Sequence, residues 1–207
     1  SQSINSSLTV SNLATAHTLT GPALSSTSST VGANTIQISF GTWSADPTPG
    51  GGQSFTSNGQ TTITVNPSSS TTLSQLRDMI NNAATDSDSD GTKDVVATII
   101  YDGSNYMLSL KSEFGAANEM KVSDTAETYA YDATDGPKLT QRVAGTDASF
   151  TVDGISMTRP NNSVDDLFAG MTLNLLKTNA SSSISIKSEV NLDNVEDILK
   201  ETDGVII

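Results

Sequence analysis

The sequence predicts a mainly β protein, a β-rich α+β fold with one well-defined central helix. Short segments in which apolar and polar residues alternate recur along the 207 residues, as in TIQISF at 35–40, and this is the period of a half-buried strand. Stretches rich in serine, threonine, asparagine and glycine separate these segments, as turns between strands would. One central segment, TTLSQLRDMINNAA at 71–84, instead has apolar residues three and four apart, which indicates a helix.

Further segments with strand character share short length and alternating apolar positions. They are 7–19, 61–65, 95–101, 106–111, 147–159, 171–177 and 183–188. The turn residues DGSN at 102–105 predict a β-hairpin, and Asp153-Gly154 predicts a second hairpin with a type I′ turn. The glycine- and proline-rich stretch 41–60 is expected to form a long loop or a hairpin tip. The stretch 112–142 is rich in turn residues and yields no assignment.

The central helix has a start signal of its own. Thr72 is a good N-cap residue, and Gln75 stands three positions later, so the pair can form a capping box. The segment NNSVDDLFAG at 161–170 is expected to form a short helical turn that ends at Gly170. The tail NLDNVEDILKE at 191–201 again has helical periodicity, and we expect it to begin a helix that continues into a longer protein.

Composition excludes several classes of function. The formal net charge is -13 and the pI is 4.1, so phosphate backbones and anionic lipid surfaces repel the chain, and we expect no nucleic acid or membrane partner. The absence of cysteine excludes disulfides, thiolate chemistry and cysteine-ligated zinc. The first ten residues, SQSINSSLTV, lack the pattern of a signal peptide and do not start with methionine, so we expect a fragment of a longer chain.

The segment DSDSDGTKD at 86–94 resembles the first half of a calcium-binding loop. Its four aspartates, with Gly91 for the sharp turn, match positions of the EF-hand pattern: Asp86, Asp88, Asp90 and Asp94. The pattern requires a glutamate at its twelfth position, where this chain has Ala97 inside a predicted strand. A calcium site would therefore need a ligand from elsewhere in the fold. The alternative is a solvated acidic turn, and we predict no metal site.

No catalytic or cofactor-binding residues are predicted. The single histidine, His17, lies in a predicted strand without a marked partner, and neither a nucleophile elbow nor a glycine-rich phosphate loop occurs. We therefore expect a protein that is not an enzyme and has no cofactor. Its aromatic residues could form a platform for sugars, but they could equally be packed between strands: Trp43, Tyr101, Tyr106, Tyr129 and Tyr131.

Three stretches in this order resemble the flagellar filament cap protein, also called the hook-associated cap. LTVSNLATAHTL at 8–19 is similar to its V-x-x-L-A strand. The helix 71–84 and the segment 95–120 are similar to the flagellar Ile-Asn motif, here Ile80-Asn81, followed by a D-G turn, a Y-x-L-x-L strand and G-A-A. DASFTVDGISMTRPNNSVDDLFAGMTLNLL at 147–176 is similar to a later hairpin of the cap protein. The stretches 41–60 and 121–140 have no counterpart in the resemblance.

The resemblance implies two β domains, one inserted in the other. Residues 1–24 and 143–190 would form a discontinuous β domain. Residues 25–142 would form an inserted β-rich domain that contains the Ile-Asn helix, and 191–207 would start a helical, coiled-coil domain. The aspartate segment 86–94 would be a small insertion after the helix, because polar loops are tolerated well at surfaces.

The function that the resemblance implies is a structural cap at the distal tip of the bacterial flagellar filament. Such a cap is a secreted, ring-like homo-oligomer that assists the folding and insertion of exported flagellin, so the implied partners are flagellin and copies of the chain itself. The hook–filament junction protein shares the Ile-Asn motif, but 147–176 favours the cap. A different class of function, an extracellular adhesin or a calcium-dependent binding module using 86–94, stays open as an alternative.

Overall fold

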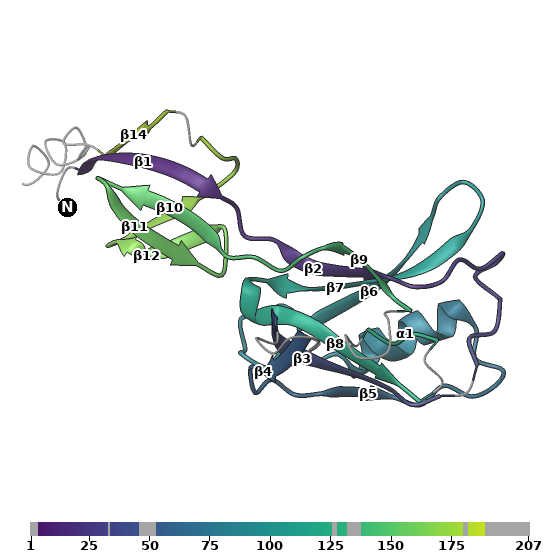
Figure 1. Ribbon diagram of the computed structural model, residues 1–207. Coiled ribbons are helices and arrows are strands. Elements are labelled where there is room, and N and C mark those ends of the chain that lie inside the picture. The colour runs from purple at the N-terminus through teal and green to yellow at the C-terminus, as the bar shows by residue number, and fades with distance from the viewer. Residues whose placement is uncertain are drawn as a thin grey trace, which may run out of the picture.

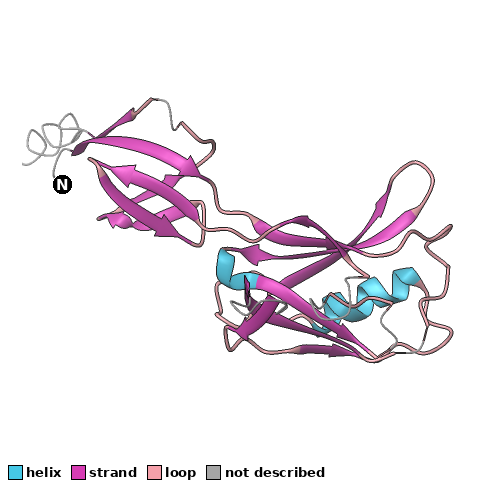
Figure 2. Ribbon diagram, in the orientation of Figure 1, coloured by secondary structure: helices cyan, strands magenta, loops and turns pink. Residues whose placement is uncertain are grey.

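Strands make up most of the structure, and they lie in two lobes joined by a narrow neck (Figure 1). The computed structural model describes residues 4–32, 34–45, 53–125, 128–131, 138–179 and 182–188. Within these ranges the only helical segments are one α-helix and one short 3₁₀ turn, both in the larger lobe (Figure 2). Neither has the length and apolar character that a bilayer crossing would need. The fold is therefore mainly β, as predicted.

The smaller lobe consists of strands from both ends of the described chain. Its strands are β1 (Ile4–Asn12), β10 (Ala148–Val152), β11 (Ile155–Arg159), β12 (Ser163–Phe168), β13 (Met171–Asn174) and β14 (Ile184–Ser188). Four of them form an antiparallel sheet in the order β11-β10-β1-β14, and β12 and β13 pair as a separate hairpin. The buried side chains between these layers form one core: Leu8, Val10, Ala14, Ala148, Phe150, Val152, Val164 and Leu175.

The hairpin β10–β11 confirms a prediction made from two residues. Asp153 and Gly154 both have positive φ, 49° and 81°, as a type I′ turn requires at its two central positions. Asp153 also accepts a hydrogen bond from the backbone N–H of Ser7 on the neighbouring strand β1, at 2.8 Å. The turn therefore fixes the register of three adjacent strands.

The prediction of a short helical turn at 161–170 was wrong. These residues form β12 and the turn to β13, in which Gly170 has a φ of 77°. Val164 pairs with Leu173 and Phe168 with Met171. The apolar spacing of 161–170 fits a helix, but pairing with the next strand buries Val164 in the core of the lobe, and tertiary packing overrides a weak local preference.

The larger lobe contains the rest of the described chain. Its elements are β2 (Ala16–Thr20), β3 (Ile36–Ala45), β4 (Gln53–Ser57), β5 (Ile63–Val65), α1 (Leu73–Ala83), β6 (Val95–Tyr101), β7 (Tyr106–Phe114), η1 (Ala116–Asn118), β8 (Glu119–Asp124) and β9 (Thr140–Val143). One sheet has the order β6-β7-β2-β9, and a second has the order β4-β3-β5, with β8 also paired to β3. Helix α1 packs against β5 and β6, and both sheets contribute side chains to a second core.

Helix α1 forms as its sequence predicts. The Thr72 hydroxyl accepts the backbone N–H of Gln75, whose side chain in turn accepts the backbone N–H of Thr72, so the capping box is complete. Leu76 and Ile80 are fully buried. Next to Ile80, the Asn81 side chain donates to the carbonyl of Ala97 and accepts its N–H, both at 2.8 Å. The asparagine of the Ile-Asn motif therefore ties the helix to β6.

Two parts of the larger lobe differ from expectation. Much of 41–60, expected to be a loop or hairpin tip, continues β3 and forms β4, while 46–52 lie outside the described residues. Strand β8, in the stretch 112–142 that gave no assignment, pairs with β3 from Ile36 to Gly41. This pairing joins segments about eighty residues apart, so local sequence patterns carry no sign of it.

The expected tail helix at 191–201 lies outside the described residues.

The chain passes between the lobes twice, at one neck. Thr15 and Thr146 pair there, with N–H to carbonyl distances of 2.9 and 3.1 Å in the two directions. Strand β2 lies beyond the neck, in the larger lobe, although the expected boundary follows residue 24; its Leu19 is fully buried in the larger core. We propose that the lobes are two domains, the larger inserted in the smaller, with the boundary at the neck.

Two core substitutions test this division. Phe150→Ala removes a fully buried ring from the smaller core and should lower its stability by about 3–5 kcal/mol. Trp43, the only tryptophan, lies in β3, so its fluorescence reports on unfolding of the larger lobe. The urea midpoint of this fluorescence transition should not change in Phe150→Ala. Leu76→Ala, in the larger core, should lower the stability of the larger lobe by about 2–5 kcal/mol, and the urea midpoint of the Trp43 transition should fall with it. Equal shifts of the Trp43 transition in both variants would contradict two separate domains.

Candidate functional site

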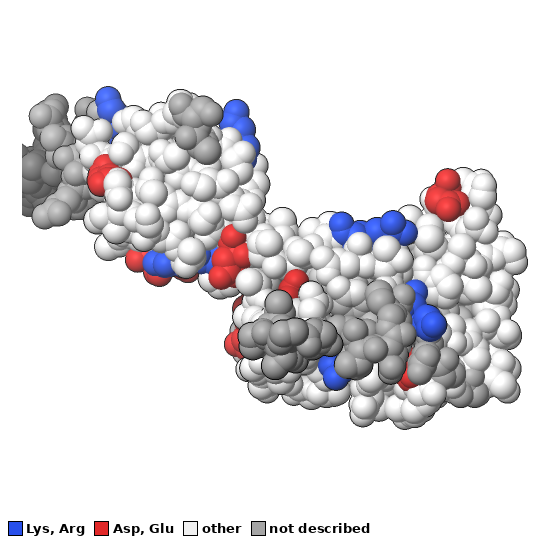
Figure 3. Space-filling view, in the orientation of Figure 1, with Lys and Arg blue, Asp and Glu red and all other residues white. Residues whose placement is uncertain are grey.

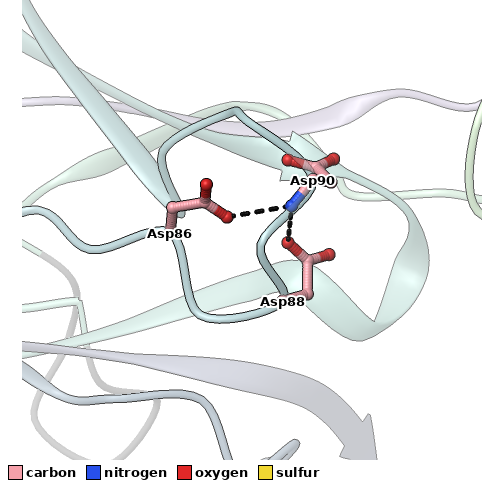
Figure 4. Close-up of side chains that lie close together, drawn as sticks. All are labelled: Asp86, Asp88 and Asp90. Atoms are coloured by element: carbon pink, nitrogen blue, oxygen red, sulfur yellow. Dashed lines mark hydrogen bonds between the residues drawn. The ribbon is translucent and has the colours of Figure 1, made fainter.

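The aspartate loop connects α1 to β6 and brings three carboxylates together. Asp86, Asp88 and Asp90 are exposed, and one oxygen of each lies within 4.8 Å of the others (Figure 4). The loop's own backbone donates to them: Asp90 N–H lies 3.1 Å from Asp86 and 3.3 Å from Asp88, and Gly91 N–H lies 3.0 Å from Asp86. Gly91, with a φ of 91°, permits the sharp turn that this arrangement needs.

Glu113 from strand β7 lies next to this loop, although nothing in the sequence points to it. The Thr92 hydroxyl is within hydrogen-bond distance of both Asp90 and Glu113, and its single proton can serve one of them at a time. Hydrogen bonds from Thr92 lower the pKa of Asp90. Burial, together with the negative charges of Asp88, Asp90 and Asp94, raises the pKa of Glu113 despite the Thr92 bond. The region is therefore one of negative potential.

The fourth aspartate does not join the cluster. Asp94 is 1% exposed, and its carboxylate accepts hydrogen bonds from the Thr85 hydroxyl and from the backbone N–H and the hydroxyl of Ser87, at 2.5, 2.9 and 2.6 Å. Ala97, at the twelfth position of the calcium pattern, lies inside β6. With one oxygen from each, the three clustered carboxylates supply three of the six to eight oxygen ligands that calcium takes. That the loop binds no metal stays a prediction.

His17 is a packing residue in the centre of the larger lobe. Its side chain is fully buried, Nδ1 accepts the backbone N–H of Met120 at 2.8 Å, and Nε2 lies 3.3 Å from the Gln141 side chain. Its ring meets that of Tyr131 edge to face at 5.4 Å. Burial lowers the pKa of His17 to about 4 against the effect of the Gln141 bond, so the ring is neutral at physiological pH. The ring therefore links β2 to β8 and β9.

The aromatic residues do not form one platform. Trp43 contacts Phe55 and Tyr131, at 4.9 and 6.0 Å between ring centroids, and its indole N–H donates to the Met120 carbonyl. Tyr101 stacks on Tyr106 at 4.6 Å near the tip of the β6–β7 hairpin. Tyr129 is buried, and that burial, with the nearby charge of Asp124, raises its pKa to about 12. Packing within strands accounts for these contacts.

A cavity of about 480 Å³ lies beside the aspartate loop, and sequence patterns gave no sign of it. Side chains of the loop, of β6 and β7, and of the segment after β11 line it, among them Asp88, Asp90, Val96, Glu113, Phe114 and Pro160. Val96 and Phe114 are exposed residues of the β6–β7 pair, whereas Pro160 follows β11 in the smaller lobe. Their convergence depends on how the two lobes meet.

Asp94→Ala tests the structural role of the buried aspartate. The substitution leaves the N–H of Ser87 and two hydroxyls without their acceptor, so we expect a loss of about 1–3 kcal/mol of stability. Asp88→Ala removes an exposed carboxylate of the same loop and should change stability by about 0.5 kcal/mol or less. Urea unfolding followed by Trp43 fluorescence measures both. An equally small effect of both substitutions would contradict this role of Asp94.

His17 should make stability depend on pH. Its folded pKa of about 4 is below the unfolded value of 6.5, so the unfolded chain binds more protons between these values and stability falls as pH falls. Lowering the pH from about 7.5 to 5 should therefore remove roughly 2 kcal/mol of stability, and this stability is fully present only well above the unfolded pKa of 6.5. His17→Gln, which keeps an acceptor but cannot titrate, should lack that loss. Parallel pH profiles for the two proteins would refute the assignment.

Comparisons with known proteins agree with the fold and with the stretch 147–176 of the resemblance. Residues 145–201 match the family model described as Flagellar hook-associated protein 2 C-terminus. A comparison with curated protein sequences gave no significant match. The family match covers the hairpin β10–β11 and the strands β12 to β14, together with residues beyond the described ranges.

Solved structures of flagellar cap proteins share the fold over most of the chain. The FliD D2-D3 domains from Serratia marcescens are 26% identical with a TM-score of 0.72, and the match covers 91% of this chain and 95% of that one. FliD (HAP2) from Pseudomonas aeruginosa PAO1 is 24% identical with a TM-score of 0.69, over 99% of this chain and 89% of that one.

A longer structure shows how much of a cap protein this chain spans. The D1-D2-D3 domains of FliD from Escherichia coli are 23% identical to this chain, with a TM-score of 0.73, and the match covers 99% of this chain but only 57% of that one. The D2-D3 domains of the Escherichia coli protein also match when they stand alone, with 24% identity and a TM-score of 0.69, over 91% of this chain and 90% of that one. The chain is therefore similar to the flagellar filament cap proteins, and it has the fold of their D2-D3 domains.

Proposed function

We propose that this chain is the outer part of a cap at the distal tip of a bacterial flagellar filament, where it assists the folding and insertion of exported flagellin. The observation that carries the proposal is the family match over 145–201, on a chain whose fold matches that of cap-protein domains over 91% of its length. Its partners would be flagellin and further copies of the same protein in a ring, and its place would be extracellular. The role is structural and does not require catalysis.

The path of the chain supports an outer position. Ile4 and Ser188 pair at one end of the smaller lobe, so the segments before and after the described chain leave from the same place. A domain joined to both would attach there, and the larger lobe would then extend away from it (Figure 1). Residues 191–207, which we propose as the start of a helical domain, follow that same end.

The composition also suits a protein that folds outside the cell. The chain contains no cysteine, so folding after export requires no oxidation, and its net charge of -13 favours solubility. The calcium-dependent adhesin alternative has less support. Of the four aspartates in the loop, Asp86, Asp88 and Asp90 cluster, while Asp94 is engaged by Thr85 and Ser87.

Deleting the gene in the source bacterium tests the proposal. Without a tip cap, exported subunits should escape unassembled, so we expect cells with hooks but no filaments and unpolymerised flagellin in the medium. Complementation with the intact gene in trans should restore filaments. Normal filaments in the deletion strain would refute the cap function.

A second observation separates the cap from the hook–filament junction protein. Gold-labelled antibodies against this chain should mark the distal ends of filaments on wild-type cells. Labelling confined to the base of the filament, next to the hook, would instead assign the chain to the junction.

A further inference from the structure

The cavity beside the aspartate loop has walls from both lobes. Pro160 and Asn161, which follow β11, belong to the smaller lobe, and the remaining lining residues belong to β6, β7, the aspartate loop and the turn after β7. On the face shown in Figure 3, acidic side chains lie on both sides of the waist between the lobes. At about 480 Å³ the cavity is large enough for a side chain or a small ligand.

Close contacts at the neck hold these walls in place. Gly115, with a φ of 105°, approaches Pro160 so closely that a Cβ atom built on it would lie 3.0 Å from the Pro160 Cβ. The Asp147 carboxylate accepts the backbone N–H of Ala116 at 2.8 Å, and Gly115 N–H donates to the carbonyl of Thr15. The cavity is therefore formed before any ligand arrives, which lowers the cost of binding.

Part of the lining is apolar and accessible. Val96 is 45% exposed and Phe114 is 40% exposed, and Pro160 faces them from the other lobe. Val96 stands opposite Lys111 across the β6–β7 ladder, on the outer face of the sheet. Accessible apolar side chains that converge at a cavity indicate a contact surface, whereas single ones scattered over a surface do not.

The charged part of the lining favours a cation. Three carboxylates line the cavity, those of Asp88, Asp90 and Glu113, against two ammonium groups. The ammonium of Lys93 is directed to the end of α1, where it donates to the carbonyls of Asn81 and Ala84 at 2.7 and 3.0 Å. The other, on Lys111, lies 5.7 Å from the centre of the Phe114 ring.

The pKa of Glu113 responds to the negative potential of these carboxylates. Its pKa is raised first by burial and then by the charges of Asp88, Asp90 and Asp94, so a cation placed among these groups would be stabilised by all of them. The contact between Lys111 and Phe114 shows that the aromatic face also accommodates a positive charge.

We propose that this cavity binds a basic side chain, arginine in preference to lysine, from an extended segment of a partner protein. The guanidinium group would lie among the carboxylates of Asp88, Asp90 and Glu113. Its apolar stem and the flanking residues of the segment would contact Val96 and Phe114. Arginine suits the site because its planar group is weakly hydrated, pairs with carboxylates through two hydrogen bonds and stacks on aromatic rings. A bare metal ion would leave the apolar lining unused.

The test uses the whole 207-residue chain, labelled with ¹⁵N, and two short blocked peptides. One peptide has the sequence Gly-Leu-Arg-Val-Gly, and the other carries citrulline, which has the same shape without the charge. The arginine peptide should cause saturable amide shifts at Val96, Glu113, Phe114 and Asn161, with a dissociation constant on the order of 1 mM. The citrulline peptide should cause none at the same concentrations.

Matched variants locate the binding. Glu113→Gln and Asp90→Asn, which keep the shape of each side chain, should each weaken binding roughly threefold to fivefold. Asp78→Asn, on α1 and paired with Arg77, should leave it unchanged. Amide spectra of the free variants, unchanged away from the substitution, establish that each one is folded.

Three results would overturn the proposal. The first is equal binding of the citrulline peptide, because then the charge plays no part. The second is the absence of saturable shifts at the cavity with the arginine peptide. The third is that calcium chloride alone shifts the same amides while the arginine peptide does not, which would make the carboxylates a metal site.

Discussion

Two chain segments cross between the lobes at one place, and the paired backbones of Thr15 and Thr146 hold them together there. The Thr15 hydroxyl also donates to the carbonyl of Ala144 at 2.7 Å, and the Asn162 side chain both donates to and accepts from the backbone of Ala14. The larger lobe consists of the chain between these two crossings, so it begins and ends at this neck. Every other contact between the lobes depends on it.

The neck also brings the walls of the cavity together. Gly115 and Asp147 bring the turn after β7 against the smaller lobe, which places Phe114 near Pro160. The aspartate loop, anchored by Asp94, extends beside them.

Local sequence patterns predicted the elements whose cause is local. The capping box of Thr72 and Gln75 and the apolar face of 71–84 specify α1 without help from the rest of the chain. Asp153-Gly154 specifies a hairpin because few other residue pairs adopt positive φ at both positions. The clustering of Asp86, Asp88 and Asp90 likewise follows from their spacing around one glycine turn.

The sequence by itself therefore determined the β-rich class, the central helix, the hairpins and, through three ordered motifs, the resemblance to the cap proteins. Tertiary structure alone decided the pairing of β8 with β3, the conversion of 161–170 to a strand, and the separation of Asp94 from the other aspartates. In each case the partner comes from a distant segment or from a buried hydrogen bond. Such contacts are chosen by packing and by the need to satisfy buried polar groups, and no short window of sequence contains them.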